Sequence, residues 1–572
     1  MPTQVSVSRR TLKRLYRPPV LGLLLFAQAV TAVVAAAPAE DYVYKVVKGD
    51  TVIGLSARLL NKPADWAAIV RHNRMRNANL VLPGQELRIP LPLLNSKLEL
   101  VTVTHVQGDV KVSTGTGAPS SVLALGATLA EGAQVVTGKD GYVTLKLRDG
   151  SVVRVQSGTE MQVERQRNYP DVGILESVMK VISGRVESLV QKFRSGDTKE
   201  TKQTRHSINT QLANLAVRGT EYRVTMDPKT TETRGEVLSG AVAVVADGSS
   251  AGAKRLDGGF GSLVDANKTV SDPVALLAAP DVAQLANLQE RTLLRFRLPA
   301  LDGARGYRAQ VARDAEFNAV VAEIVSPSPE LRVANIDDGG YYLRVRGVDA
   351  RGLEGRDATH AFKLKARPEP PAVSSPAPKG KVRALEVEFK WAENTEAATY
   401  HIQVAKDAAF KSLVFEDKGV KGPQALAGKL ALGEYFWRIA SLRKDGDRGP
   451  YGDVASFGLF APPAQPEPPK VGDGDISFRW AGETGQKFDF QLAADAKFAQ
   501  PIVTRTLDKP EIDLPRPKPG EYFMRYRATD PDGFVGPYTA AQKFSVPLPP
   551  PCLRDSEGRC VSSTFGLVAP LN

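Results

Sequence analysis

The chain has 572 residues, 40 of them prolines and 49 glycines, and its formal net charge is +12 at pH 7. That length is too great for one hydrophobic core, so several domains joined by many turns are expected. The basic residues are scattered among acidic ones along most of the chain, which argues against nucleic acid as a partner.

Residues 1–39 have the order of features that is typical of a secretory signal peptide. Basic side chains lie between Arg9 and Arg17, an apolar run extends from Val20 to Val34, and small residues lead up to Ala39. The apolar run is shorter than the roughly twenty residues that cross a bilayer. We expect secretion to the periplasm by the general route, cleavage after Ala39 and no membrane span in the mature chain. A retained N-terminal anchor and a twin-arginine signal are the alternatives.

Residues 40–96 predict a strand, two short helices and a second strand. The segment YKVVKGDT alternates in polarity up to Gly49, and Asp50 and Thr51 are good N-cap residues for a helix over VIGLSARLL. A second helix is predicted from Asp65, and Pro83-Gly84 precedes the closing strand QELRIP.

This segment resembles the lysin motif, LysM, which recognises the N-acetylglucosamine backbone of peptidoglycan and chitin. The resemblance is carried by Val46, Gly49-Asp50-Thr51, Trp66, Asn73 and the ending PGQELRIP. It implies a βααβ fold and a shallow glycan-binding groove with two walls, formed by Gly49, Asp50, Thr51 and Val52 and by Asn79, Leu80, Val81 and Leu82. Valine at 52 replaces the usual leucine. Trp66, Ile69 and Asn73 are expected to be core or loop-bracing residues, and such a groove needs no catalytic side chain.

Residues 97–273 read as strands separated by glycine turns. The clearest hairpin is YVTLKLRDGSVVRV, with its turn at Asp149-Gly150, and EVLSGAVAVV reads as one later strand. The segments GDVKV, SGRV and LAVRGTEYRV resemble the FecR-type domain, a periplasmic β domain first known from iron-transport signalling. The family implies a signalling role, but no later apolar segment is long enough to supply the spanning helix of that layout.

The densest basic region, residues 180–223, is interpreted as a solvated surface of this domain. Attraction to peptidoglycan carboxylates or anionic lipid is the alternative. Within it, Arg218-Gly219-Thr220 is interpreted as a backbone turn at Gly219 and not as a binding site.

An internal repeat follows, with the segments YRAQVARDAEF, YHIQVAKDAAF and FDFQLAADAKF beginning at positions 307, 400 and 488. Each copy is preceded by a strand that ends on an aromatic residue, namely Phe296, Trp391 or Trp480, which we expect to be buried. The copies resemble fibronectin type III modules and predict three β-sandwiches over 274–368, 369–463 and 464–548. Proline-rich links near 366–380 and 461–470 separate them.

The tail, residues 549–572, holds both cysteines, Cys552 and Cys560, which an oxidising compartment would join in a disulfide. We expect no metal, no cofactor and no catalytic residue, because the five histidines are dispersed: His72, His105, His206, His360 and His401. The resulting fold class is multidomain and mainly β. The resulting hypothesis is a non-enzymatic, wall-associated periplasmic scaffold that binds peptidoglycan and an unidentified envelope protein. A periplasmic sensor or signalling component is the alternative.

Overall fold

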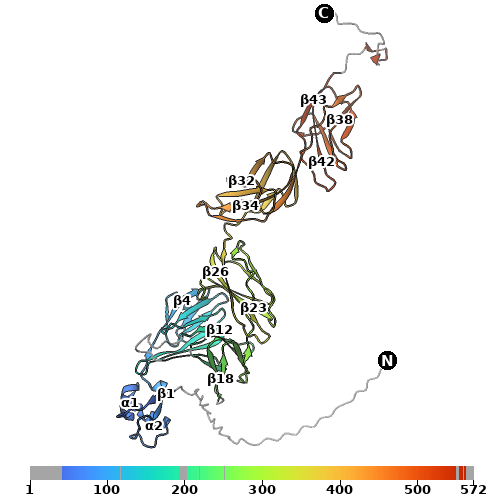
Figure 1. The fold of residues 1–572 in the computed structure, drawn as a ribbon. Helices are drawn as coiled ribbons and strands as arrows, with labels where there is room; N and C mark the ends of the chain where they lie inside the picture. Colours follow the sequence, from blue (N-terminus) through green and yellow to red (C-terminus); the bar gives the residue numbers. More distant parts are fainter. Residues whose placement is uncertain are drawn as a thin grey trace, which may run out of the picture.

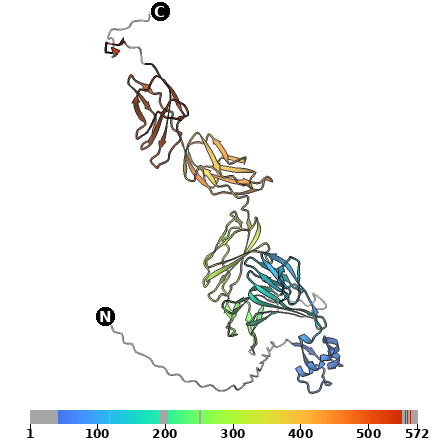
Figure 2. The same ribbon diagram turned by 180° about the vertical axis from the view of Figure 1, so that it is seen from behind.

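The structure is a computed structural model that describes residues 41–115, 118–191, 203–217, 219–249, 252–548, 553–554, 556–557 and 560–561. The predicted signal peptide and Cys552 lie outside these residues, so cleavage and the disulfide stay predictions. The described chain is mainly β, as predicted, and its units follow one another in a long arrangement (Figures 1 and 2). No helix in the described ranges is long and apolar enough to cross a membrane.

The N-terminal unit, residues 41–96, has the predicted order of strand, helix, helix and strand. Thr51 caps the first helix, because its hydroxyl accepts the backbone N–H of Gly54 at 3.0 Å. The two strands pair antiparallel with Lys45 opposite Glu86, so the loops that follow the first strand and precede the second leave from the same end. The elements are β1 (Asp41–Lys45), α1 (Val52–Leu59), the 3-10 turn η1 (Pro63–Asp65), α2 (Trp66–His72), β2 (Glu86–Pro90) and the 3-10 turn η2 (Leu91–Leu93).

The next unit, the β domain of residues 97–275, shares a hydrophobic core with the N-terminal unit. Tyr169, Val172 and Ile174 of the β domain belong to the same buried cluster as Leu87 and Leu91. The side-chain amide of Asn95 also donates to the carboxylate of Asp171 at 3.2 Å. Burial of these apolar side chains fixes the N-terminal unit against the β domain.

Two sheets form the β domain, and one long strand, β12, belongs to both. Its first half pairs with β11 and β13, whereas residues from Gly184 onward pair with β10 and β15. Gly184 has a positive φ of 87°, and a Cβ there would lie 2.5 Å from the Cα of Thr159, so the crossing point requires glycine. The strands are β3 (Lys97–Leu98), β4 (Val101–Gln107), β5 (Val110–Ser113), β6 (Ser121–Val122), β7 (Thr128–Leu129), β8 (Gln134–Thr137), β9 (Tyr142–Lys146), β10 (Val152–Val155), β11 (Glu160–Tyr169), β12 (Ile174–Leu189), β13 (Gln203–Asn209), β14 (Ala213–Val217), β15 (Glu221–Asp227), β16 (Glu232–Ser239), β17 (Ala241–Ala246), β18 (Lys254–Asp257), β19 (Phe260–Val264) and β20 (Val274–Ala275).

The hairpin predicted around Asp149-Gly150 is confirmed as β9 and β10, but the single strand predicted over EVLSGAVAVV is wrong. That segment forms two strands in different sheets, because β16 pairs with β15 and β19 whereas β17 pairs with β14 and β18. The chain turns at Gly240, where φ is +84° and a Cβ would lie 2.8 Å from the hydroxyl of Thr220. Gly219 also has a positive φ, as the interpretation of a backbone turn requires.

The three repeats each form two packed sheets, which we call sandwich 1 (288–364), sandwich 2 (373–460) and sandwich 3 (470–546). Their strand pairs are antiparallel except β21 with β27 and β29 with β36, which are parallel. Phe296, Trp391 and Trp480 are buried in three separate cores, as predicted. The strands are β21 (Leu288–Gln289), β22 (Leu294–Arg297), β23 (Gly306–Ala312), β24 (Val320–Ser326), β25 (Glu330–Val333), β26 (Gly339–Val348) and β27 (Ala358–Leu364); β28 (Val373–Ser375), β29 (Gly380–Arg383), β30 (Glu386–Trp391), β31 (Thr399–Ala405), β32 (Leu413–Val420), β33 (Gln424–Gly428), β34 (Gly433–Leu442), β35 (Arg448–Tyr451) and β36 (Ala455–Phe460); β37 (Lys470–Val471), β38 (Asp475–Arg479), β39 (Lys487–Ala493), β40 (Val503–Leu507), β41 (Glu511–Pro515), β42 (Gly520–Thr529) and β43 (Gln542–Val546); the tail adds β44 (Leu553–Arg554) and β45 (Cys560–Val561).

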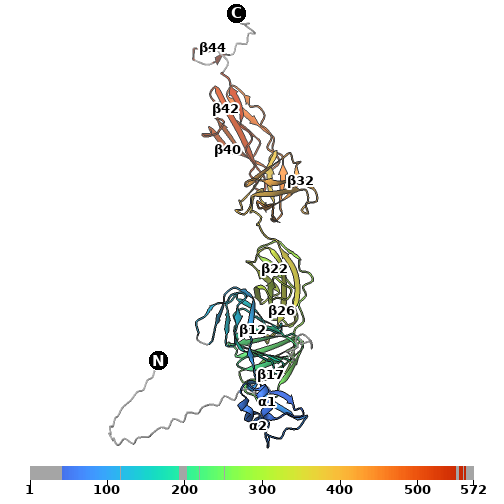
Figure 3. The same cartoon turned by 90° about the vertical axis from the view of Figure 1, so that its left-hand side faces the viewer.

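Sandwich 1 lies against the β domain (Figure 3), and buried charged groups join the two. Glu187 of β12, whose side chain is 1 % exposed, accepts two hydrogen bonds of 2.8 Å from the guanidinium of Arg344 in β26 and one from Arg154. Burial by itself would raise the pKa of Glu187, but the positive charges of Arg344 and Arg154 outweigh burial and hold that pKa well below its usual range. Glu187 is therefore ionised within the interface.

A second group of buried charges extends the same interface. Glu323 of sandwich 1 accepts hydrogen bonds from Arg185 and Ser157 of the β domain, at 2.7 and 2.6 Å. Arg185 also lies 3.2 Å from the carboxylate of Glu354, and Arg223 donates to Asp357 at 2.8 Å. Arg185 and Arg223 belong to the basic region that the sequence was interpreted to place in solvent. That interpretation is wrong for these two arginines, because acidic residues more than a hundred positions later in the chain cover them.

His206 in β13 is a buried histidine that makes stability depend on pH. Its Nε2 lies 3.0 Å from the hydroxyl of Ser188, and burial lowers its pKa to about 4. In the unfolded chain the pKa is about 6.5, so between these values the unfolded state binds a proton that the folded state excludes. The stabilisation is complete above about pH 6.5 and is lost as pH falls towards about 4, by up to about 3 kcal/mol.

We therefore predict that the free energy of unfolding, measured by denaturant titration at about pH 7 and about pH 4.5, falls more steeply in the native protein than in a His206→Gln variant. Carboxylates contribute equally to both proteins, so the difference reports His206. Equal falls in the two proteins would contradict the prediction.

Candidate functional site

The first predicted groove wall lies in the loop between β1 and α1, and Asp50 braces this loop. One carboxylate oxygen of Asp50 accepts the backbone N–H of Val47 and the hydroxyl of Tyr44, both at 2.8 Å. The hydrogen bond from Val47 lowers the pKa of Asp50, so the carboxylate stays ionised at neutral pH. Gly49, which directly precedes Asp50, has a φ of +94°, a conformation that glycine adopts without strain.

The second predicted wall, residues 79–82, is largely exposed and lies in the loop before β2. Leu80 and Leu82 are each 60 % exposed, Asn79 is exposed and Val81 is half-buried. The two loops are tied together where they leave the sheet, because the N–H of Gly84 donates to the carbonyl of Val46 at 2.8 Å. Two exposed leucines on such a small unit are apolar surface that is available to a ligand.

The structure places one predicted wall residue elsewhere. Val52 is 1 % exposed and packs in the core of the N-terminal unit, so its side chain is not available to a glycan. The side chain beside it, Ile53, is 59 % exposed. Val52 opens α1, and the helical turn directs residue 52 inward and residue 53 outward.

Two residues that sequence reasoning missed hold the first loop in place. Arg58 on α1 donates to the hydroxyl of Tyr44 at 2.8 Å, and its guanidinium carbon lies 5.6 Å from the centre of the Tyr44 ring. Both side chains converge on Asp50. Positions 44, 50 and 58 meet only through their side chains in the folded unit, so no local sequence pattern could predict the contact. Asn73 and Ile69 have the predicted bracing and core roles, since the Asn73 amide donates to the carbonyls of Ile69 and Arg88.

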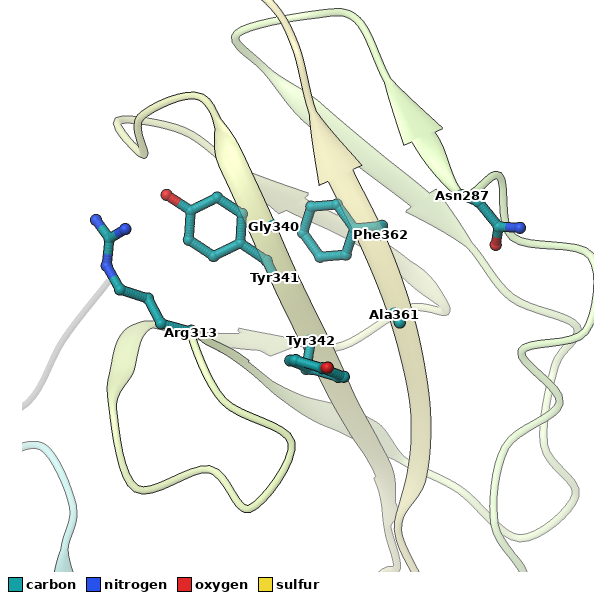
Figure 4. A pocket seen from close by; sticks show the side chains of 7 residues that line it. All are labelled: Asn287, Arg313, Gly340, Tyr341, Tyr342, Ala361 and Phe362. Carbon is teal, nitrogen blue, oxygen red and sulfur yellow. The ribbon is translucent and has the colours of Figure 1, made fainter.

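Sandwich 1 carries a shallow hollow of about 400 Å³ that is lined mainly by residues of β26 and β27 (Figure 4). Its floor includes Tyr341 and Phe362, which are 2 % and 4 % exposed and stack with their ring centres 5.8 Å apart. Arg313 lies at one side, 5.5 Å from the centre of the Tyr341 ring. The aromatic residues therefore belong mainly to the core, as the sequence pattern favoured.

Comparison with known families identifies two domains. Residues 44–90 match the family model described as LysM domain, and residues 133–243 match the one described as FecR protein. Both are families of non-catalytic binding or signalling domains. None of the curated proteins compared with the chain matches it.

Solved structures give weaker likenesses. A "putative anti-sigma factor" from Parabacteroides distasonis is 18 % identical with a TM-score of 0.20, and the match covers 25 % of this chain and 59 % of that one. The FN1–FN3 domains of chicken CNTN1 are 15 % identical with a TM-score of 0.20, and cover 47 % of this chain and 98 % of that one. A two-domain fibronectin type III segment of chicken tenascin is 12 % identical with a TM-score of 0.16, and covers 31 % of this chain and all of that one. These likenesses are too weak to indicate a function.

Proposed function

We propose that this chain is a non-catalytic protein of the bacterial cell envelope that binds the N-acetylglucosamine-containing glycan of peptidoglycan through its N-terminal unit. The observation that carries the proposal is the LysM match over 44–90, with the exposed loop 79–82 beside the braced loop at Gly49 and Asp50. After export to the periplasm, the β domain and the three sandwiches would be held at the wall, where they would engage an envelope protein.

The site would read sugar acetamides with backbone groups and apolar contact. Gly49, Thr51 and Asn79 would offer backbone donors and acceptors, while Leu80 and Leu82 would pack against the sugar rings. A shallow contact with a few rings offsets little association entropy, so we expect a dissociation constant on the order of tens of micromolar to millimolar for one glycan segment. Asp50 acts through Val47 and Tyr44 as a positioning residue and not as a direct contact.

The test is sedimentation of the chain from residue 40 onward with purified peptidoglycan whose carboxylates have been amidated, which leaves only the glycan to recognise. The longer chain is used because Tyr169 and Ile174 complete the core of the N-terminal unit. A Leu80→Gln, Leu82→Gln variant should bind about ten-fold more weakly, since it loses apolar contact worth about 1.4 kcal/mol. Salt of about 0.3 M should change binding little.

The matched control is Val122→Gln, Leu125→Gln, at two exposed apolar residues of the β domain that are 79 % and 70 % exposed. It removes similar exposed apolar surface and should bind like the unmodified chain. Equal sedimentation of the groove variant and this control, or loss of all binding at about 0.3 M salt, would show that the groove is not the anchor.

A signalling role is the second candidate, and the FecR match over 133–243 favours it. In this chain sandwich 1 already covers the sheet that contains Arg154, Glu187 and Arg223. A signalling partner would therefore bind the other sheet of the β domain, which contains β11, β13 and β14, or it would displace sandwich 1.

A further inference from the structure

The three sandwiches repeat one pair of polar residues at the same place in the sheet. The pair is Gln310 opposite Arg344 in sandwich 1, Gln403 opposite Arg438 in sandwich 2 and Gln491 opposite Arg525 in sandwich 3. In each copy the arginine donates to the side-chain oxygen of the glutamine, at 2.6, 2.9 and 2.8 Å respectively. The glutamine thus fixes one edge of the guanidinium.

A phenylalanine from the repeated DAxF segment supports each arginine. The guanidinium carbon lies 4.5 Å from the ring centre of Phe317 in sandwich 1, 4.0 Å from that of Phe410 and 4.1 Å from that of Phe498. All three phenylalanines have a positive φ, between 55° and 59°. This backbone conformation is strained for a bulky residue, so its recurrence in three copies indicates that the loop is built to place the ring under the arginine.

We call each set of glutamine, arginine and phenylalanine an arginine cradle. In sandwich 1 the cradle binds a carboxylate. Glu187 of the β domain lies on the free edge of Arg344, with two parallel hydrogen bonds of 2.8 Å. Such a bidentate pair is the strongest and most geometrically specific contact that a guanidinium makes. The chain itself therefore shows which ligand the cradle accepts.

In sandwiches 2 and 3 the arginine of the same cradle pairs with no acid of the described residues, although Gln403 donates to Glu416 at 2.8 Å. No carboxylate of the described chain is within salt-bridge distance of Arg438 or Arg525, and both are half-buried. A second ring covers the other flat face, because the ring centre of Tyr451 lies 4.0 Å from Arg438 and that of Tyr538 lies 4.2 Å from Arg525. Two rings hold each guanidinium rigid and leave only its edge for a ligand.

We propose that Arg438 and Arg525 are carboxylate-binding sites that take the peptide carboxylates of the cell wall. Because Phe410 and Tyr451 flank Arg438, only the edge of the guanidinium is left for a ligand. A thin, extended peptide reaches such an edge more easily than a second β domain does. The identification of the wall as the source of the carboxylate rests on the proposed function. The inference that these arginines bind a carboxylate does not. The residue opposite Gln491 is Thr504, whereas the one opposite Gln403 is Glu416, so the site at Arg525 has less negative charge beside it.

The experiment compares the retention of the chain from residue 40 onward on native and on amidated peptidoglycan. We expect about ten-fold tighter binding to the native wall, and an Arg438→Gln, Arg525→Gln variant should lose that difference and bind both walls alike. The matched control is Lys421→Gln, Arg505→Gln, which removes the same charge from exposed positions of the same sandwiches and should keep the difference. Arg438→Lys, Arg525→Lys keeps the charge without the bidentate edge and should lose most of it.

Three results would overturn the proposal. One is unchanged binding of the double glutamine variant to the native wall. Another is an equal loss in the Lys421 and Arg505 control, which would mean attraction by diffuse charge only. The third is no difference between the two walls for the unmodified chain, which would mean that any acid on these arginines comes from a protein. A groove variant that binds amidated wall normally would contradict the proposed glycan groove alone, since the difference between the walls depends on the arginines.

Discussion

Replacing Glu187 with alanine is expected to lower the free energy of unfolding of the unit formed by the β domain and sandwich 1 by about 3–5 kcal/mol. The carboxylate is 1 % exposed and neutralises Arg154 and Arg344, whose side chains are 6 % and 5 % exposed. Without it, both guanidinium groups stay buried without their nearest counter-charge, because Asp357 lies 3.9 Å from Arg344 and can replace it only in part. Calorimetric unfolding of the chain from residue 40 onward would show this as a lower midpoint for the transition of that unit alone.

The matched comparison is Arg344→Ala against Arg438→Ala. Both arginines stack on a phenylalanine and donate to a glutamine, but only Arg344 binds a buried carboxylate. Arg344→Ala should therefore destabilise its unit by several kcal/mol, whereas Arg438→Ala should cost sandwich 2 about 1 kcal/mol. Equal losses of unfolding free energy in the two variants would mean that stacking of the arginine on phenylalanine, and not the ion pair with Glu187, stabilises the interface.

The second large effect is expected from Trp480→Ala, which should destabilise sandwich 3 by about 3–5 kcal/mol. Trp480 is 5 % exposed, and its ring stacks at 4.7 Å on Tyr526 and at 5.7 Å on Phe490. Alanine would leave a cavity between the two sheets that these rings cannot fill. Calorimetry and denaturant unfolding followed by tyrosine fluorescence would measure the loss, because the other three tryptophans lie outside sandwich 3.

Trp391→Ala is the parallel case in sandwich 2, where Trp391 is 4 % exposed and meets Tyr400 edge-on. The control is Ile502→Ala in sandwich 3, because Ile502 is 53 % exposed and its loss should stay within about 0.5 kcal/mol. A Trp480→Ala protein as stable as the Ile502→Ala protein would refute the assignment of Trp480 to the core.

The N-terminal unit and the sandwich cores could be predicted because their signals are local. Alternating strands, the Thr51 cap and the recurring aromatic at Phe296, Trp391 and Trp480 follow from short periodicities that a chain expresses wherever it folds. The glycan groove stays a prediction that rests on the LysM resemblance. Val52 departs from it, because helix α1 begins at that residue and turns its side chain inward.

The sequence by itself therefore determined the mainly β class, the position of the repeats and the residues of the loops at 49 and 80. The tertiary structure decided how the units meet. Nothing local distinguishes Arg185 or Arg223 from solvated arginines, since their acidic partners Glu354 and Asp357 lie in another unit. It also decided that the chain turns at Gly240 and divides one apolar run between two sheets, at a position where φ is +84° and Thr220 leaves no room for a Cβ. Contacts between residues far apart in sequence depend on the packing of whole units, which no short pattern encodes.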